Sequence, residues 1–288
     1  MMAIRKKRKT RAARLWMLHL LTVAWCVLAL GALVAMVGKW KCGAVVSCGV
    51  DEATLERMCT VTLPDSIPDE EVRLTGFTVH FNSLRHVPNY VAYRLKCATI
   101  GEKAASSYSG PFFSFEEVKG CPTPEDYTKS GYQRGHMAPA ADMKWSAAAQ
   151  RDSYVMLNIC PQRKELNAGA WRRLEDKVRE WAQRDRELVV ITGPVWYGDH
   201  TYAPSAIGKG KVSVPTHFFK VVAAPYACPM RAIAFVMPNA DVPDAITHYA
   251  VSVDEVERLT GFDFFHTLPD EVQCGMEESV NADGWFQL

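Results

Sequence analysis

Residues 130–142 read SGYQRGHMAPAAD, a segment in which glycines stand close to a single histidine. Gly131 and Gly135 enclose a polar triplet, and this arrangement favours a tight turn that presents His136. A neutral imidazole, with a pKa of about 6.5, can accept a proton from water at physiological pH. The segment alone leaves two interpretations open, a structural histidine and a general base.

A helix is predicted over residues 167–181, which read NAGAWRRLEDKVREW. Its apolar residues fall on one stripe at the helical period: Trp171, Leu174, Val178 and Trp181. Asn167 points along the same stripe, and Glu175 and Arg179 flank it. One interpretation is that Asn167 caps the helix while Glu175 and Arg179 form a surface pair. The other is that all three face a common neighbour.

The rest of the chain favours an α+β fold. Strands are predicted at residues 76–81, 91–95, 154–158, 187–192, 214–222 and 231–237, with a polar loop between residues 101 and 130. Few helices intervene and there is no regular alternation of strand and helix, so a parallel sheet with crossover helices is not expected.

The N-terminal region differs in composition from the rest. Residues 1–14 form a basic leader, and Leu15–Gly38 is an uncharged apolar run that is long enough to cross a membrane. We expect it to be a transmembrane anchor or targeting segment, followed by a linker at residues 39–72 and a folded domain at 73–288. The leader fits a signal anchor and a mitochondrial presequence equally well, and a buried helix is the remaining alternative.

The charge distribution excludes a generally basic protein. Nine of the 33 basic residues precede Asp51, whereas none of the 32 acidic residues does. Nucleic acid could therefore be held only by a local patch and a metal ion. Residues 129–184 hold eleven Lys and Arg against six Asp and Glu. The candidates for phosphate contact are Arg163, Lys164, Arg172 and Arg173; the alternative is a solvated helix face.

Cysteine spacing gives no sign of a zinc site. The nine cysteines include no C-x-x-C pair and no suitable combination with histidine. We expect mostly buried free thiols, with a disulfide among Cys42, Cys48 and Cys59 left open.

Further blocks of sequence give the histidine segment a context. Residues 158–162 read NICPQ, and residues 166–175 read LNAGAWRRLE. Together with residues 131–136, in this order and spacing, they resemble the DNA/RNA non-specific endonucleases. Shorter blocks at 192–194, 214–220, 236–239 and 251–261 resemble the endonuclease G branch of that family. The likeness extends from about Thr75 to Phe265.

The resemblance implies a ββα-metal nuclease fold with a central, mostly antiparallel sheet flanked by helices. It makes His136 the general base and Asn167 the one protein ligand of a hydrated Mg²⁺, with Mn²⁺ as the alternative ion. Magnesium keeps several waters in proteins, so a single protein ligand suits it. Glu175 would hold water around the ion.

The same resemblance assigns the remaining site residues. Arg134 and Arg179 would contact phosphate oxygens, while Asn158 and Gln162 would support the site. Gln133 stands where the family usually has aspartate. Because its amide brings no negative charge, we expect weaker metal binding or a slower rate.

The resemblance also implies cleavage of both DNA and RNA, a homodimer, and attachment to the mitochondrial inner membrane with the catalytic domain in the intermembrane space. A secretory-pathway membrane anchor is the alternative location. Two other functions remain open: a nuclease-like nucleic-acid-binding membrane protein that has lost turnover because of Gln133, and a membrane interaction protein that only shares the fold.

Overall fold

The computed structural model describes residues 49–104, 108–197, 204–243, 245–280 and 282–286. The described residues belong to one compact unit that extends from Ala44 to Leu288. The predicted leader and the apolar segment Leu15–Gly38 lie outside the described residues, so the predicted anchor is not tested. In the described part of the chain, no helix is both long and apolar enough to cross a membrane.

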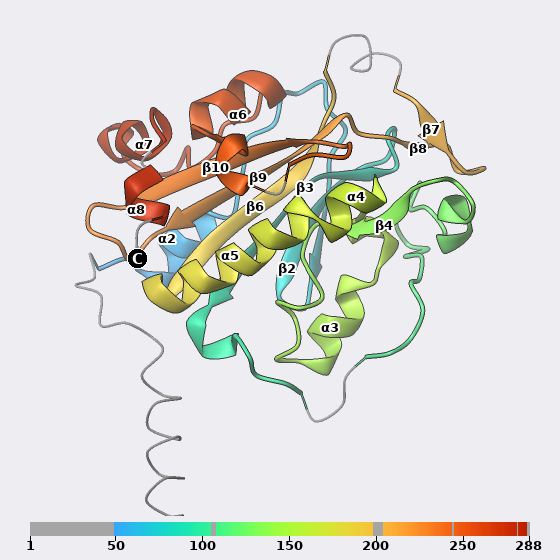
Figure 1. Ribbon diagram of the computed structural model, residues 1–288, viewed down its shortest axis with the longest axis horizontal. Helices are drawn as coiled ribbons and strands as arrows, with labels where there is room; N and C mark the ends of the chain where they lie inside the picture. Colours follow the sequence, from blue (N-terminus) through green and yellow to red (C-terminus); the bar gives the residue numbers. More distant parts are fainter. Residues whose placement is uncertain (1–48, 105–107, 198–203, 244, 281, 287–288) are drawn as a thin grey trace, which may run out of the picture. The chain divides into compact units, whose positions relative to one another are not determined.

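A seven-stranded sheet forms the centre of the fold (Figure 1). Its strands lie in the order β1-β2-β3-β6-β9-β10-β11, and every neighbouring pair is antiparallel. Their bounds are β1 Glu70–Leu74, β2 Phe77–Asn82, β3 Val87–Lys96, β6 Glu187–Val195, β9 His217–Ala224, β10 Arg231–Pro238 and β11 Ala250–Val251. This arrangement confirms the predicted α+β class with a central antiparallel sheet.

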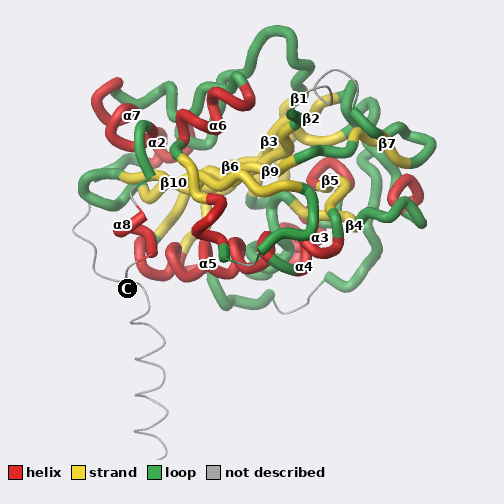
Figure 2. Tube along the Cα trace, turned by 45° about the horizontal axis from the view of Figure 1, so that its top comes forward, coloured by secondary structure: helices red, strands yellow, loops and turns green. Residues whose placement is uncertain are grey.

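Both faces of the sheet are buried, and strand β9 illustrates why. Phe218 and Val222 point into the hydrophobic core on one face, whereas Phe219 and Val221 point into the core on the other. Side chains alternate along a strand, so a strand that is covered on both faces has a nearly continuous apolar sequence. Helix α5 (Ala170–Asp185) covers the first face, and helices α6 (Val253–Thr260) and α7 (Asp270–Glu277) lie on the opposite side (Figure 2).

A small two-stranded unit lies on the α5 side. Strand β4 (Gln133–His136) pairs with β5 (Ile159–Gln162), and α4 (Lys164–Ala168) and α5 follow directly. The remaining elements are α2 Glu52–Arg57, η1 Cys97–Thr99, η2 Pro124–Tyr127, α3 Ala147–Ser153, η3 Met156–Asn158, the pair β7 Ala206–Ile207 and β8 Val212–Ser213, η5 Ile246–Tyr249 and α8 Ala282–Phe286.

The predicted helix over residues 167–181 is wrong in its first turn. Gly169, at φ −103° and ψ −114°, ends α4 and serves as the N-cap of α5. The chain therefore changes direction at Gly169, and Asn167 lies in the last turn of a separate short helix. Asn167 does not cap the long helix, so that alternative interpretation is also wrong.

Two strand predictions are corrected as well. Residues 156–158 form a 3₁₀ turn, and the strand begins only at Ile159. The Asn158 side chain bonds to backbone groups of other segments, an arrangement that competes with strand pairing. Strand β1, which was not predicted, begins inside the predicted linker and ends beyond it; it is an edge strand with mostly exposed side chains, so it lacks the apolar alternation that marks a strand.

Two of the described cysteines depart from the prediction of free thiols. Cys97 and Cys228 are disulfide-bonded. Cys59 is free, so it takes no part in the disulfide that the sequence left open, and Cys121, Cys160 and Cys274 are free as predicted.

Candidate nuclease site

His136 ends strand β4 in an aromatic surrounding. Its ring lies 5.3 Å from that of Phe112 and 5.2 Å from that of Tyr154, measured between centroids. Burial lowers the pKa of His136 to about 4, because the charged imidazolium loses its hydration there. Nε2 is buried and has no hydrogen-bond partner among the described residues. The ring is therefore neutral at physiological pH, and one nitrogen is left for an outside group.

Asn158 holds the backbone that follows His136. Its Oδ1 accepts from the Ala138 N–H at 2.8 Å, and its Nδ2 donates to the Ala138 carbonyl at 2.9 Å and the Ser153 carbonyl at 2.8 Å. The Met137 N–H donates to the Asn158 carbonyl. Asn158 is completely buried, and these bonds fix the direction in which the chain leaves β4.

Gly135 is required because a neighbouring side chain leaves no room for a Cβ atom, and not because the backbone turns there. It lies within β4, and a Cβ atom placed on it would collide with the side chain of Gln162. The turn that the sequence predicts is at Gly131, whose φ of +84° lies in the left-handed region. The two glycines are therefore required for different reasons. Gln162 is fully buried against this strand, and neither of its amide atoms has a hydrogen-bond partner among the described residues.

A hydrogen bond joins Asn167 to the histidine strand. Nδ2 of Asn167 donates to Oε1 of Gln133 at 2.8 Å. Because this bond occupies the amide nitrogen, it turns the Asn167 oxygen away from Gln133 and leaves it as an acceptor. Gln133 and His136 are the two ends of β4, so α4 and the histidine strand form one unit.

Arg179 is held by carboxylates other than Glu175. Its Nη1 lies 2.6 Å from Oδ1 of Asp142, and its Nη2 bonds to Asp176 in the same helix. Asp142 also accepts from the Tyr93 hydroxyl at 3.0 Å, and its side chain is only 1% exposed. The predicted surface pair between Glu175 and Arg179 is thus not formed. Asp142 binds Arg179 to the loop that follows the histidine strand.

Glu175 faces the buried Lys220 of strand β9. Burial raises the pKa of the Glu175 carboxyl and lowers the pKa of the Lys220 ammonium. The positive charge of Lys220 lowers the pKa of Glu175, and the negative charge of Glu175 raises the pKa of Lys220, so each charge counteracts the effect of burial on the other group. Lys220 is fully buried, and its Nζ lies 4.6 Å from the centre of the Trp171 ring. No hydrogen-bond partner of this nitrogen occurs among the described residues. Lys220 therefore supplies positive potential beside the carboxyl groups of Glu175 and Asp142.

Arg134 is partly buried against the segment that precedes β4. Its Nη2 donates to the carbonyl of Pro124 at 2.6 Å, and its guanidinium lies 5.5 Å from the centre of the Phe112 ring. Its Nε is buried and has no partner in the described part of the chain. Arg134 shares Phe112 with His136, so the two side chains lie on the same side of β4.

The four predicted phosphate contacts are exposed. They are Arg163, Lys164, Arg172 and Arg173, at the start of α4 and the start of α5. The guanidinium of Arg163 lies 4.7 Å from the centre of the Tyr132 ring, beside β4. The structure thus places these cations at the same end of the unit as Gln133 and Asn167.

Sequence reasoning missed Lys220, Asp142 and Tyr93. A signal existed for Lys220: it shares the inward-facing stripe of β9 with Phe218 and Val222, where a cation is unexpected without a partner. Asp142 and Tyr93 come from a loop and a distant strand, and no local pattern connects them to α5.

The strand pair, the helix behind it and these polar residues all lie in a part of the chain that matches a known family. Residues 56–271 match the sequence profile of the DNA/RNA non-specific endonuclease family. Since the match includes three quarters of the sequence, the chain belongs to this family.

Among its relatives, the chain is 41% identical over 155 residues to "Nuclease EXOG, mitochondrial" of Danio rerio. It is 39% identical over 153 residues to "Endonuclease G, mitochondrial" of Bos taurus. The matched stretches cover 50% and 49% of this chain, and 45% and 50% of those proteins. The chain therefore spans about half the length of these relatives.

A solved structure supports the same fold. A chain in the crystal structure entitled "Crystal structure of the EndoG/EndoGI complex: Mechanism of EndoG inhibition" superposes with a TM-score of 0.66 at 26% identity. The superposition covers 72% of this chain and 89% of that one. The mixed α+β architecture is therefore shared with a member of the endonuclease G group.

Proposed function

We propose that this protein is a magnesium-dependent endonuclease that hydrolyses phosphodiester bonds in DNA and RNA with little sequence preference. Membership of the endonuclease family supports the reaction class. The observation that carries the proposal is the state of His136, a neutral imidazole whose Nε2 has no partner among the described residues. In this proposal, β4, β5 and the following helices are the ββα-metal unit of the fold.

His136 acts as the general base. Its Nε2 accepts a proton from the attacking water, and the neutral ring is available for this step because burial keeps its pKa low. Phe112 and Tyr154 restrict the orientation of the ring. Asn158 fixes the adjoining backbone, so a displaced imidazole would require several buried hydrogen bonds to break.

Asn167 would hold the magnesium ion through its side-chain oxygen, and Glu175 would orient water beside it. The donor set fits the ion, because both groups offer oxygen and magnesium prefers oxygen ligands. When bound, Mg²⁺ stabilises negative charge on the phosphate and on the leaving oxygen. Lys220 favours the ionised form of the Glu175 carboxyl, whose pKa burial raises.

Arg179 and Arg134 would contact phosphate oxygens of the substrate. Arg179 is oriented for this by Asp142, whereas Arg134 has to exchange its bond to the Pro124 carbonyl for one to phosphate. Arg163, Lys164, Arg172 and Arg173 extend the contact along the nucleic-acid backbone. Contacts to phosphate carry no sequence information, so they suit a substrate range that includes both DNA and RNA.

The runner-up function is a nuclease-like nucleic-acid-binding protein without turnover. The observation that favours it is Gln133, which bonds Asn167 but supplies no negative charge. We prefer the active enzyme because Gln133 preserves the orientation of the Asn167 amide, and His136 and Glu175 are both present.

The relatives from Danio rerio and Bos taurus are named mitochondrial, and we propose a mitochondrial location for this chain. In detail, residues 15–38 would anchor it in the inner membrane, with the catalytic domain in the intermembrane space as a homodimer. The disulfide-bonded Cys97 and Cys228 fit an oxidising compartment. Imaging residues 1–60 fused to a fluorescent protein tests the location against a secretory-pathway anchor.

The decisive experiment is cleavage of plasmid DNA and of a structured RNA in the presence of Mg²⁺. We expect both to be cut, EDTA to abolish cleavage, and His136→Ala to lower the rate roughly 100-fold to 10,000-fold, as loss of a general base does. The matched control is His248→Ala, which removes an exposed histidine and should leave the rate unchanged.

Three outcomes would contradict the proposal or favour its runner-up. Cleavage that survives EDTA, or that survives His136→Ala, excludes the metal and histidine mechanism. Binding of nucleic acid without cleavage by the unaltered protein favours the runner-up.

A further inference from the structure

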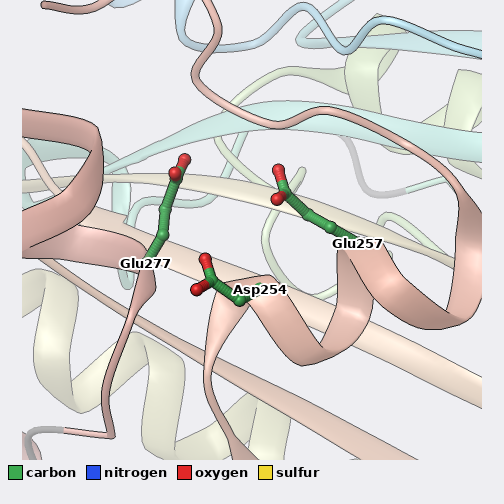
Figure 3. Close-up of side chains that lie close together, drawn as sticks. All are labelled: Asp254, Glu257 and Glu277. Carbon is green, nitrogen blue, oxygen red and sulfur yellow. The ribbon is translucent and has the colours of Figure 1, made fainter. Parts of the chain in front are cut away.

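Three carboxylates meet on the face of the sheet opposite the nuclease site. Asp254 and Glu257 come from helix α6, and Glu277 ends helix α7 (Figure 3). One oxygen from each lies within 4.8 Å of the others. Asp254 and Glu257 are three residues apart and so project from the same side of α6. The side chains in Figure 3 point into a common space between the two helices.

Glu277 is the unusual member of this acidic cluster. Its side chain is buried, with only 7% of the residue exposed, and its Oε1 has no hydrogen-bond partner among the described residues. A buried carboxylate without a partner is costly, so natural structures normally pair it or bind a cation to it. Burial and the neighbouring carboxylates raise its pKa to about 8.

The surroundings supply no compensating positive charge. Among the described residues, no ion pair includes Asp254, Glu257 or Glu277. From Val253 to Leu288 the sequence has nine acidic residues but one basic residue, Arg258. Arg258 is already bonded to Glu255 on an exposed part of α6, at 2.6 Å.

The cluster is also held in place before any ion binds. Oε1 of Glu257 accepts from the Phe264 N–H at 2.8 Å, which leaves the second oxygen of the carboxylate for a ligand. Helices α6 and α7 both pack on strand β10. Asp254 is exposed and Glu257 is half-buried, so water can complete a coordination sphere from the solvent side.

We propose that Asp254, Glu257 and Glu277 bind one calcium ion that joins helices α6 and α7. The ligands are all carboxylates with no histidine or cysteine, a set that selects a hard cation over zinc. Calcium accepts six to eight oxygen ligands in flexible geometry, which suits three carboxylates from two separate helices together with water.

Calcium titration by calorimetry tests the site, using the full chain in detergent. Asn167→Ala serves as the background, because it removes the proposed magnesium ligand. We expect this background to bind one calcium ion. Adding Glu277→Gln should weaken binding at least tenfold, whereas adding Glu278→Gln, which removes an exposed neighbouring charge, should not.

A second variant separates binding from folding. Asp254→Asn alters an exposed side chain and should weaken calcium binding without lowering the melting temperature in EDTA. The proposal is overturned if the Asn167→Ala background binds no calcium, if it binds magnesium in preference to calcium, or if both Glu277→Gln and Asp254→Asn bind calcium as tightly as the background.

Discussion

The two faces of the central sheet differ in whether their buried carboxylates lie beside positive charges. Beneath α5, Asp142 pairs with Arg179 at 2.6 Å, and Glu175 faces the ammonium of Lys220. Between α6 and α7, the charged neighbours of Glu277 among the described residues are other carboxylates. The first face balances its charges within the fold, whereas the second carries an excess of negative charge.

This difference would suit two kinds of metal site, one for each of the two proposed ions. On the balanced face, a cation would gain little from net charge and would bind through the neutral amide oxygen of Asn167 and through water. Such binding is weak and exchangeable, which suits a catalytic ion. On the other face, a cation would relieve repulsion among three carboxylates, and this suits a structural ion that stabilises the packing of α7.

The largest expected effect is a loss of stability on removing one partner of the buried ion pair beneath α5. Asp142→Asn leaves Arg179 without its buried partner and should lower the free energy of unfolding by about 3 kcal/mol, in the range measured for broken buried ion pairs. Denaturant unfolding monitored by tryptophan fluorescence measures this loss. Asp176→Asn removes the exposed partner of the same arginine and is the matched control, for which a change below about 1 kcal/mol is expected.

Removing a buried carboxylate charge on the opposite face should raise stability instead of lowering it. The folded-state pKa of Glu277, about 8, lies above the value of an unfolded chain. Ionisation therefore disfavours folding, and stability in EDTA should fall as the pH rises from about 4.5 through 8. Glu277→Gln should remove this loss, so that its melting temperature at pH 9 exceeds that of the unaltered protein. A lower melting temperature at pH 9 would contradict the assignment of excess charge to this face.

The buried lysine gives a smaller effect, on activity. Lys220→Met removes the charge that opposes the rise in the Glu175 pKa. The rising part of the pH–rate profile, where Glu175 becomes ionised, should therefore move to higher pH by roughly one unit, a tenfold change in the ionisation equilibrium. Lys177→Met, which disrupts a surface pair with Glu180, is the control. A lower rate with an unshifted profile would mean that Lys220 only maintains packing.

The sequence could point to the candidate site residues because they are close together in the chain. His136, Asn158, Asn167 and Glu175 all lie in the segment from β4 to α5, so their spacing could be compared directly with a family pattern. The two partners Lys220 and Asp142 could not be placed in this way. Lys220 joins the site through the pairing of β6 with β9, and Asp142 meets Arg179 across 37 residues of sequence.

The sheet was predicted in its components but not in its order. Alternation and apolar runs located β2, β6, β9 and β10, yet nothing local indicates that β3 pairs with β6. The break at Gly169 was missed because the sequence on both sides favours a helix. The acidic cluster was missed for a similar reason, since Glu277 reaches Glu257 only through the docking of α7, which depends on packing.

Restoring the family's charge at the metal site should raise activity. Gln133→Asp keeps an oxygen that can accept from Asn167 Nδ2 and adds a negative charge near the ion. We expect half-maximal activity at a roughly tenfold lower Mg²⁺ concentration, equivalent to about 1.4 kcal/mol. Gln183→Asp adds the same charge near the far end of α5 and should change nothing. No gain in rate or in magnesium affinity for Gln133→Asp would mean that the missing charge does not limit this enzyme.

The smallest expected effect distinguishes the two faces by their contact with nucleic acid. Arg172→Gln removes one exposed cation at the start of α5 and should reduce the slope of log affinity against log salt by about 0.7 to 0.9, the contribution of one phosphate contact. Arg258→Gln removes an exposed cation on the opposite face and should leave the slope unchanged. Both are measured by fluorescence anisotropy with the inactive His136→Ala protein. Equal slopes for the two variants would mean that Arg172 is only a solvated helix residue, whereas a lower slope for Arg258→Gln alone would place the nucleic acid on the face that carries the acidic cluster.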